Sequence, residues 1–374
     1  MSKLPHVGTT IFTEMSLLAK QTNAINLSQG FPNFPVDERL TEILKNKSTQ
    51  DIHQYMPMAG SPELINQIQQ LTLKSYDRSI GQNEVLITAG ATQGIFSTII
   101  ALVKNGDEVI ILDPSYDCYE PAIVLAGGIP IRIQLNDDYT PNWNAIEEKF
   151  SDKTKMIITN NPHNPSGRIW EESDYLNLEE LLNTFPSTIL LSDEVYEYIT
   201  FEKGHISANQ RPNLLDRTIV VSSFGKTFHI TGWKMGYIVA PEKLLSEIKK
   251  VHQFNVFSVN SVAQSVLTDY LKIVDVKSLG AFYQTKRDLF QNLLSKSNFR
   301  CLQSEGTYFQ LVDYSSISKI DDVSFCKELA IKHGVAAIPV SVFSQQKTSN
   351  QHIRFCYAKD DETLFNASEK LCQI

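Results

Sequence analysis

Five short runs of apolar residues, each followed by polar or turn-forming residues, constrain the fold of this chain more than any other feature. Within each run the apolar residues are consecutive rather than alternating, which is typical of strands buried on both faces. Helical patterns separate the runs, so we predict an α/β fold whose central sheet is mainly parallel and covered by helices. The runs cover residues 84–88, 108–112, 156–159, 188–192 and 218–221.

The polar residues after the runs are expected to meet in space. Parallel strands end at the same edge of a sheet, and open α/β sheets bind ligands at the carboxyl ends of their strands. We therefore expect the five loops to form one site. In chain order, the loops contain Gly90, Tyr116, Asn164, Asp193 and Lys226.

The chain has 374 residues, which is enough for more than one domain. A helical pattern begins at Pro241, and beyond about residue 275 a helix containing Arg287 precedes shorter strand patterns around residues 307–312 and 352–356. Pro32 and Pro35 lie in an irregular N-terminal stretch. We predict an N-terminal arm that packs with the small domain, a large domain, and a small C-terminal α+β domain. Their bounds are residues 1–35, 36–275 and 276–374.

Composition excludes several classes of function. The net charge is −8 and no block is rich in Lys or Arg, which argues against a nucleic-acid surface. No apolar run approaches the roughly 20 residues of a membrane-spanning helix, and the N-terminus lacks the apolar core of a signal peptide. The five cysteines are scattered without a CxxC pair, so we expect reduced thiols, no metal site and a cytoplasmic protein.

Lys226 is the first candidate for chemistry, because it follows a buried strand in a turn rich in Ser and Gly. Partial burial lowers the pKa of a lysine and leaves a neutral amine that can attack a carbonyl group. Lys234 brings a second cation towards the same turn. One reactive amine beside one anion-binding amine suggests a phosphorylated aldehyde cofactor, pyridoxal phosphate. The alternative is that Lys226 is an ordinary surface lysine.

A phosphate group needs backbone N–H groups at the start of a helix, together with hydroxyl groups and a cation. The segment from Gly90 through Ala91 and Thr92 opens a helical pattern, while Ser223 and Lys234 offer the hydroxyl group and the charge. The alternative is a plain connection between a strand and a helix, since this glycine turn matches neither a Walker loop nor GxGxxG.

A pyridine ring needs an anion that keeps its nitrogen protonated, because the cofactor withdraws electrons only in that form. Asp193 ends a buried strand, where an unpaired carboxylate would be costly. Asn164 and Tyr196 can donate hydrogen bonds to the ring's phenolic oxygen, and Tyr116 can provide an aromatic platform for the face of the ring. The alternatives are that Asp193 caps a helix and that the Tyr and Asn residues are structural turn residues.

A substrate carboxylate is best held by an arginine that donates two hydrogen bonds. Arg354 lies between apolar residues of a strand pattern, where burial without an anionic partner would be costly. The alternative is an internal salt bridge.

Together these segments resemble the class I aminotransferases of fold type I. Residues 223–234 look like the lysine segment of that family, and residues 161–167, 193–196 and 353–356 match its other signatures in the expected order. Within the family, the chain resembles the branch that contains the kynurenine aminotransferases and bacterial methionine aminotransferase. The segments that carry this closer likeness are residues 26–32, 251–254 and 305–309.

The resemblance assigns a role to each candidate residue. Lys226 binds the cofactor covalently and then moves a proton, Asp193 pairs with the pyridine nitrogen, and Tyr116 stacks on the ring. Asn164 and Tyr196 bond the ring oxygen. The phosphate is bound by the amides of Ala91 and Thr92 with Ser223 and Lys234, and the substrate carboxylate by Arg354, Asn164 and Gly30. The family is dimeric, and the resemblance implies that Tyr55 reaches the cofactor of the neighbouring subunit.

The expected activity is ping-pong transamination between an amino acid and a 2-oxo acid. The side-chain pocket implied by the resemblance is apolar and partly aromatic, which favours methionine, phenylalanine and tyrosine, and extends to kynurenine or glutamine, over aspartate. The residues expected to form it are Phe31, Tyr55, Phe254, Phe257 and Tyr308.

Three other activities remain open. The first is β-elimination of cysteine conjugates at the same site, which also needs Lys226. A serine hydrolase is suggested by Ser223-x-x-Lys226, although neither SDN nor KTG follows it. A non-catalytic pyridoxal-binding protein would leave Arg354 unexplained.

Overall fold

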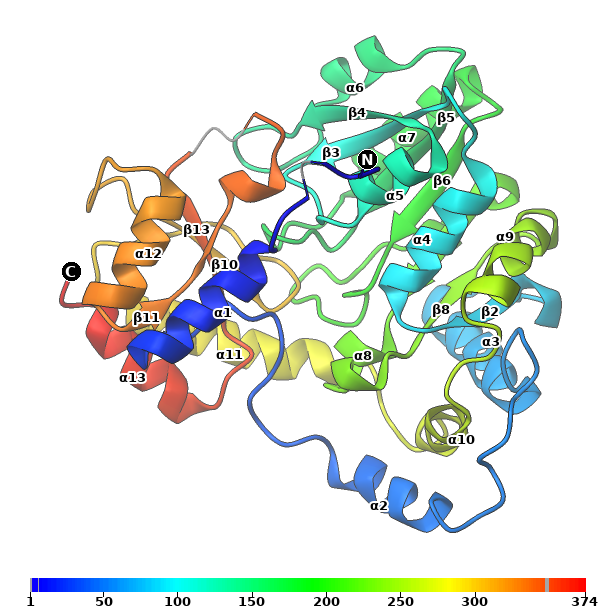
Figure 1. Cartoon of the computed structure of the whole chain (residues 1–374), viewed down its shortest axis with the longest axis horizontal. Coiled ribbons are helices and arrows are strands. Elements are labelled where there is room, and N and C mark those ends of the chain that lie inside the picture. Colours follow the sequence, from blue (N-terminus) through cyan, green and yellow to red (C-terminus); the bar gives the residue numbers. More distant parts are fainter. Residues whose placement is uncertain (1, 6, 347–349) are drawn as a thin grey trace.

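The structure is a computed structural model that describes residues 2–5, 7–346 and 350–374. Its centre is a seven-stranded sheet with the order β2-β8-β7-β6-β5-β3-β4 (Figure 1). All neighbouring strands are parallel except for the two antiparallel pairs that β8 makes. The strands are β2 (Val85–Thr88), β3 (Glu108–Asp113), β4 (Ile129–Gln134), β5 (Thr154–Asn160), β6 (Ile189–Asp193), β7 (Thr218–Ser222) and β8 (Gly236–Val239). The predicted α/β fold with a mainly parallel sheet is confirmed.

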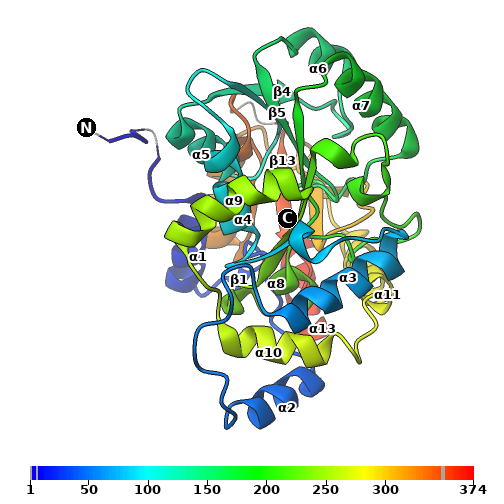
Figure 2. The ribbon, with the colours of Figure 1, turned by 90° about the vertical axis from the view of Figure 1, so that its right-hand side faces the viewer.

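Helices bury both faces of this sheet, as the consecutive apolar residues require. One face packs against α4 (Ala91–Leu102), α5 (Tyr119–Ala126) and α9 (Glu242–Asn255). The other face packs against α3 (Pro62–Tyr76), α6 (Trp143–Lys149), α7 (Glu172–Thr184) and α10 (Ser261–Tyr270). Helix α10 also packs against α2 (Glu38–Lys47), and Figure 2 shows these two helices beside α3.

Two strands of the sheet were not predicted from the sequence, and each omission has a physical reason. Strand β4 lies at the edge of the sheet, only one of its six residues is buried, and it contains Pro130. A proline is tolerated there because an edge strand has backbone N–H groups that need no partner. Strand β8 has four residues, as β2 does, but it begins with a glycine and runs antiparallel to both neighbours.

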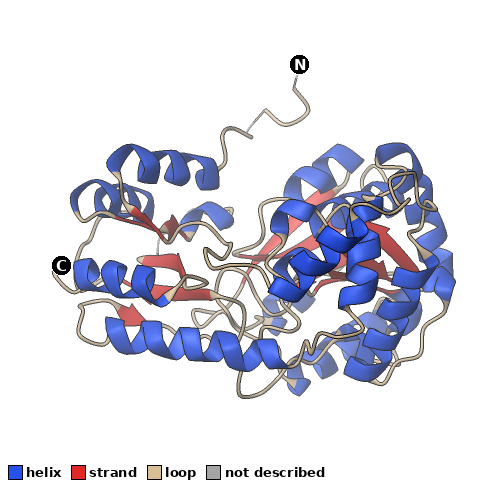
Figure 3. Cartoon of the chain, turned by 90° about the horizontal axis from the view of Figure 1, so that it is seen from below, coloured by secondary structure: helices blue, strands red, loops and turns tan. Residues whose placement is uncertain are grey.

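A smaller antiparallel sheet lies beside the central one (Figure 3). Its order is β12-β13-β10-β9, and the predicted strand patterns around residues 307–312 and 352–356 correspond to β10 and β13. The strands are β9 (Arg300–Cys301), β10 (Phe309–Asp313), β12 (Ile338–Pro339) and β13 (His352–Cys356). The helices beside it are α11 (Ser278–Leu294), α12 (Asp322–Lys332) and α13 (Asp361–Leu371).

The N-terminal segment packs against this second part of the molecule. Helix α1 (Ile11–Thr22) contacts α12, and β1 (Ile25–Asn26) pairs in parallel with β11 (Val335–Ala336). Domain boundaries at residues 35 and 275 remain a prediction. None of the helices in the described part of the chain has both the length and the apolar character needed to cross a membrane.

Candidate active site

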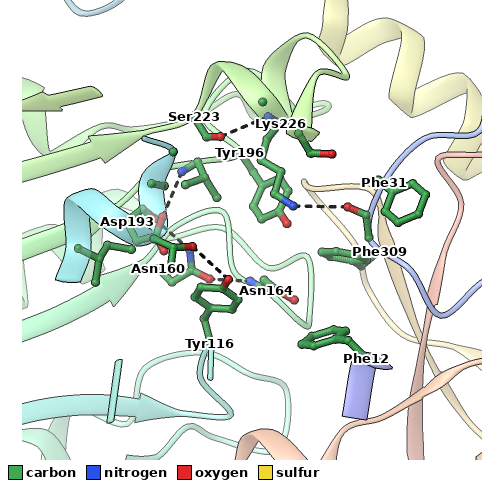
Figure 4. A pocket seen from close by; sticks show the side chains of 18 of the residues that line it. Phe12, Phe31, Tyr116, Asn160, Asn164, Asp193, Tyr196, Ser223, Lys226 and Phe309 are labelled. Atoms are coloured by element: carbon green, nitrogen blue, oxygen red, sulfur yellow. Dashed lines mark hydrogen bonds between the residues drawn. The ribbon is translucent and has the colours of Figure 1, made fainter. Parts of the chain in front are cut away.

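A cavity of about 260 Å³ lies at the carboxyl ends of the central strands, where they meet the second sheet and the N-terminal segment. Figure 4 shows side chains from separate segments converging on it, with the rings of Phe12, Phe31 and Phe309 on one side. The structure brings most of the predicted site residues together, but Tyr55, Phe254, Phe257 and Tyr308 do not line the cavity. The predicted residues that line the cavity are Gly30, Phe31, Ala91, Thr92, Tyr116, Asn164, Asp193, Tyr196, Ser223, Lys226, Lys234 and Arg354.

Lys226 is held inside this cavity by the end of β7. Ser223 caps the short helix α8 (Phe224–Thr227), and its hydroxyl accepts a hydrogen bond of 3.3 Å from the backbone N–H of Lys226. The side-chain amine of Lys226 donates to the carbonyl oxygen of Gly30 at 3.4 Å. Burial, followed by the positive charge of Arg354, lowers the pKa of Lys226 to about 8. Lys226 is therefore not a solvated surface lysine, and near neutral pH part of it is a neutral amine.

Asp193 is the last residue of β6, and only 3% of its surface is exposed. The Tyr119 hydroxyl donates a hydrogen bond of 2.6 Å to its Oδ2 atom. Burial raises the pKa of Asp193 to about 6, although the bond from Tyr119 opposes the rise. The residues that follow form a turn rather than a helix, which contradicts the helix-cap alternative. In the described part of the chain this carboxylate has no ion-pair partner, so the site offers a buried anion to a cationic ligand.

The raised pKa of Asp193 predicts a pH-dependent stability of the apoprotein. The folded state holds this proton more tightly than the unfolded state, so its contribution is present at low pH and is lost as the pH rises through about 6. Between pH 5 and 8, we expect the free energy of unfolding of the wild-type apoprotein to fall by about 1 kcal/mol relative to Asp193→Asn. Urea unfolding of both proteins at the two pH values measures this difference, and an equal change in both would contradict it.

The start of α4 forms a seat for an anion. Gly90 precedes the helix with a φ of 79°, and no side chain caps the first N–H groups. A Cβ atom on Gly90 would lie 3.6 Å from the Lys234 amine, so this cation lies beside the helix start. On Gly236, a Cβ atom would come within 2.9 Å of the Ala91 nitrogen, so glycine is needed where the two backbones approach. Free amides, a helix dipole, an ammonium group and the Ser223 hydroxyl together suit a phosphate.

Aromatic and amide groups form the walls between these charged residues. The hydroxyl groups of Tyr116 and Thr92 lie 3.3 Å apart, and the Tyr116 ring packs edge-on against Tyr119 at 5.8 Å. The Tyr196 ring packs edge-on against Tyr308 at 5.3 Å, and the Lys226 amine lies 5.9 Å from the Tyr196 ring centre. Tyr116 and Tyr196 thus lie where a flat ring near Lys226 would contact them.

Arg354 is buried in β13, with 1% of its surface exposed. Its Nη1 atom donates to Asn164 Oδ1 at 2.7 Å, and its Nη2 atom donates to the Ser28 carbonyl oxygen at 3.3 Å. The guanidinium carbon lies 3.9 Å from the centre of the Phe309 ring. Among the described residues, Nε has no hydrogen-bond partner and no carboxylate forms an ion pair with Arg354. These contacts contradict the salt-bridge alternative, and they leave a buried cation with spare donor capacity.

Several cavity residues were missed by the sequence analysis. Phe12 comes from α1 and Phe309 from β10, while Asn160 donates from its side chain to the backbone carbonyl oxygen of Asp193 at 3.0 Å. Tyr119, which bonds Asp193, lies three residues after Tyr116 and begins helix α5. That proximity was the one signal available for Tyr119. Phe309 lies in the 305–309 segment and Asn160 directly precedes the 161–167 segment, but neither was singled out, and no motif marks Phe12.

Tyr55 lies outside the cavity of its own chain. It is 81% exposed, and its ring packs edge-on against Phe257 at 5.3 Å. Phe254 is 88% exposed. Of the five residues predicted for the side-chain pocket, Phe31 lines the cavity. Tyr308 is fully buried and contacts the lining residue Gly30, because its hydroxyl donates a hydrogen bond of 2.8 Å to the Gly30 carbonyl oxygen.

Comparison with known proteins identifies the family. The sequence pattern of the family described as aminotransferase class I and II matches residues 22–371. The chain belongs to this family. It is therefore an aminotransferase of fold type I, and like the rest of its family it depends on pyridoxal phosphate.

The relatives of the aminotransferase cover nearly all of its length. Methionine aminotransferase of Escherichia coli is 47% identical over all of this chain and 98% of the relative. Human kynurenine–oxoglutarate transaminase 3 is 32% identical over 98% of this chain and 88% of the relative. A solved structure of the Escherichia coli protein YbdL, described as having a methionine aminotransferase function, has a TM-score of 0.98 and 46% identity, and covers 100% of this chain and 99% of that one. These relatives do not favour the β-elimination alternative.

The residues present in the cavity fit the cofactor. The buried Asp193 carboxylate, which has no ion-pair partner in the described part of the chain, matches a protonated ring nitrogen. The uncapped start of α4, with Lys234 beside it, matches a phosphate. Lys226 matches the aldehyde, since burial keeps part of its amine neutral. When bound, pyridoxal phosphate supplies an electron sink for the substrate's α-carbon.

Proposed function

We propose that this aminotransferase moves the amino group of an L-amino acid with an apolar or aromatic side chain to a 2-oxo acid by a ping-pong mechanism. Methionine is the favoured donor, followed by phenylalanine and tyrosine, and the range extends to kynurenine or glutamine. The observation that carries the proposal is Arg354, a buried guanidinium group with a free Nε donor and no carboxylate partner in the described part of the chain. A substrate carboxylate would supply the missing partner.

The walls around Arg354 support an apolar side chain on the substrate. Its guanidinium carbon lies 5.5 Å from the ring centre of Phe12 and 3.9 Å from that of Phe309. Among the described residues, the cations that line the cavity are Arg354, Lys226 and Lys234, and the last two are already assigned to the cofactor. A second carboxylate on the substrate would therefore have no further cationic side chain in this cavity lining to pair with. The names of the Escherichia coli and human relatives point to the same class of substrate.

Arg354 and Lys226 act on different parts of the substrate, the carboxylate and the α-carbon. Arg354 holds the carboxylate together with Asn164 and the backbone of Gly30, which fixes the position of the α-carbon. The neutral amine of Lys226 would then take the proton from the substrate's α-carbon, and the resulting ammonium group would deliver it to the carbon of the cofactor's former aldehyde group, which is the 1,3-proton shift that transamination needs. A pKa of about 8 suits this exchange, because both forms of the amine are populated near neutral pH.

The other cavity residues would hold the cofactor. Asp193 keeps the ring nitrogen protonated, Asn164 and Tyr196 bond the ring oxygen, and Tyr116 covers one face of the ring. Phosphate binding is assigned to Ala91, Thr92, Ser223 and Lys234. Phe31 closes the substrate side of the cavity.

We also propose a cytoplasmic homodimer in which Tyr55 completes the phosphate seat of the neighbouring subunit. The support is the exposure of three aromatic side chains on one chain. Tyr55 and Phe254 are more than four-fifths exposed, and Phe257, which packs against Tyr55, is 46% exposed. Isolated aromatic side chains are common on protein surfaces, but a group of them marks an interface.

A panel of amino donors tests the proposed substrate class. We expect kcat/KM for methionine and phenylalanine to exceed that for aspartate by about 100-fold, because burial of an unpaired carboxylate costs several kcal/mol. Each donor is assayed with the same 2-oxo acid, and alanine shows the contribution of the shared carboxylate alone. Faster turnover of aspartate than of methionine and phenylalanine would contradict the proposal.

A further inference from the structure

Four consecutive backbone carbonyl groups, those of residues 28–31, each accept a hydrogen bond from a side chain. The segment that they form lines the cavity beside Arg354, so these bonds fix one wall of the substrate site. The bonds run from Arg354 to Ser28 (3.3 Å), from Lys359 to Gln29 (3.4 Å) and Phe31 (2.7 Å), and from Tyr308 to Gly30 (2.8 Å).

Lys359 is an unusual residue to find in this position. It is buried, with 3% of its surface exposed, and in the described part of the chain it forms no ion pair with a carboxylate. Its partners are two carbonyl groups and the ring of Phe31, whose centre lies 5.2 Å from the amine. An ammonium group buried without an anion is costly, and an apolar residue of the same length would serve stability better. The contacts with the 28–31 segment therefore explain why this position is a lysine and not an apolar residue.

The far end of the segment is anchored next to Lys359. The Asn33 side-chain amide donates to Asp360 Oδ2 at 2.8 Å and accepts from the Asp360 backbone N–H at 2.7 Å. Lys359 and Asp360 follow β13, which carries Arg354 five residues before Lys359. One short stretch of chain thus carries Arg354 and also anchors the wall beside it.

Phe31 is the part of this wall that depends most on Lys359. Its ring lines the cavity, but 47% of its surface is exposed, so little packing fixes its position. The bond from Lys359 to its carbonyl oxygen and the contact with its ring supply that constraint. Gly30, between the two bonded carbonyl groups, is held with it, and its own carbonyl oxygen meets the Lys226 amine at 3.4 Å.

We propose that Lys359 is a positioning residue that sets substrate selectivity. It holds Phe31 at a fixed place relative to Arg354, so that a large apolar side chain packs against the Phe31 ring while the carboxylate is bound. The inference rests on the proposed function, because it concerns donors with such side chains. A donor with a small side chain does not reach the Phe31 ring, so it gains from Lys359 only through the position of the Gly30 backbone.

The test compares the holoenzymes of wild type, Lys359→Met and Lys249→Met. Lys249 is a matched control, because it is partly buried, bonds the Asn83 carbonyl oxygen at 3.1 Å, and lies on α9 outside the cavity lining. We expect Lys359→Met to lower the ratio of kcat/KM for methionine to that for alanine by about 10-fold, mainly through KM, because the charge-assisted hydrogen bond that fixes Phe31 is lost; this change corresponds to about 1.4 kcal/mol. Lys249→Met should leave the ratio unchanged.

Two further measurements separate positioning from a general loss of structure. In Lys359→Met, the backbone amides of residues 28–33 should exchange hydrogen faster, and 3-phenylpropionate, a carboxylate that cannot react, should bind more weakly while propionate binding hardly changes. Phe31→Ala should lower the methionine-to-alanine ratio by itself, and adding Lys359→Met should lower it little further, because both changes remove the same contact.

The outcomes distinguish this inference from the proposed function. An unchanged methionine-to-alanine ratio in Lys359→Met overturns the inference, and so does an equal loss for both donors, which indicates a purely structural role. If the effects of Lys359→Met and Phe31→Ala on the methionine-to-alanine ratio are fully additive in the double variant, Lys359 does not act through Phe31. Failure of the wild-type enzyme to transaminate methionine or phenylalanine overturns the proposed function instead.

Discussion

Replacing Lys226 with alanine is expected to abolish transamination and to remove the absorbance band that the covalently bound cofactor gives the native protein. Lys226 is the amine that binds the aldehyde and also the group that carries the proton of the α-carbon, so the substitution removes two functions at once. Loss of a single positioned acid–base group lowers rates by about 10²–10⁴-fold, and loss of the covalent link adds to this. We expect turnover to fall by at least about 10⁴-fold.

Two control variants show whether the loss has this cause. Lys226→Arg keeps a positive charge in the cavity but has no amine that becomes neutral near pH 7, so it should be as inactive as the alanine variant. Lys249→Ala, on the surface of α9, should keep both activity and absorbance. Both are checked by the absorbance spectrum and by the rate with methionine as donor. Activity retained in Lys226→Ala would refute the assignment of the catalytic lysine.

Much of the fold could be predicted because the central sheet is buried on both faces. A strand in that setting is apolar at consecutive positions through its middle, and this pattern marks β2, β3, β5, β6 and β7. The same reasoning could not find β4, since an edge strand needs only partial burial and admits a proline. Strand β8 was also missed, although it is as long as β2, because one of its four residues is Gly236 and a glycine weakens the strand pattern.

The residues of the candidate site also differ in whether the sequence could predict them. Residues that follow the parallel strands were predictable, since topology alone brings Asp193 and Lys226 to the same edge. Phe12 and Lys359 were not, because they approach the cavity from segments whose position depends on how the second sheet packs. Phe12 lies more than three hundred residues from Arg354 in the sequence, and yet its ring is 5.5 Å from the guanidinium carbon. Such contacts are set by tertiary packing, which leaves no periodic signal in the sequence.

Replacing Arg354 with methionine is expected to lower kcat/KM for amino acids by about 10²–10³-fold, chiefly through KM. Removal of one partner from a buried, hydrogen-bonded pair of charges costs about 2–5 kcal/mol, and here the lost partner binds the substrate's carboxylate. Lys226 and Asp193 remain in place, so the absorbance of the bound cofactor should persist. Arg354→Lys should recover only part of the loss, since an ammonium group cannot donate two parallel hydrogen bonds to a carboxylate.

A donor without a carboxylate provides the decisive control for Arg354. Wild type and Arg354→Met should react with 2-phenylethylamine at similar slow rates, because this amine has nothing for Arg354 to bind. The thermal stability of the apoprotein should stay the same or rise in the methionine variant, since Arg354 is buried without an ion-pair partner in the described part of the chain and an apolar side chain removes that cost. A lower melting temperature with equal losses for phenylalanine and 2-phenylethylamine would mean that Arg354 supports the fold and not the substrate.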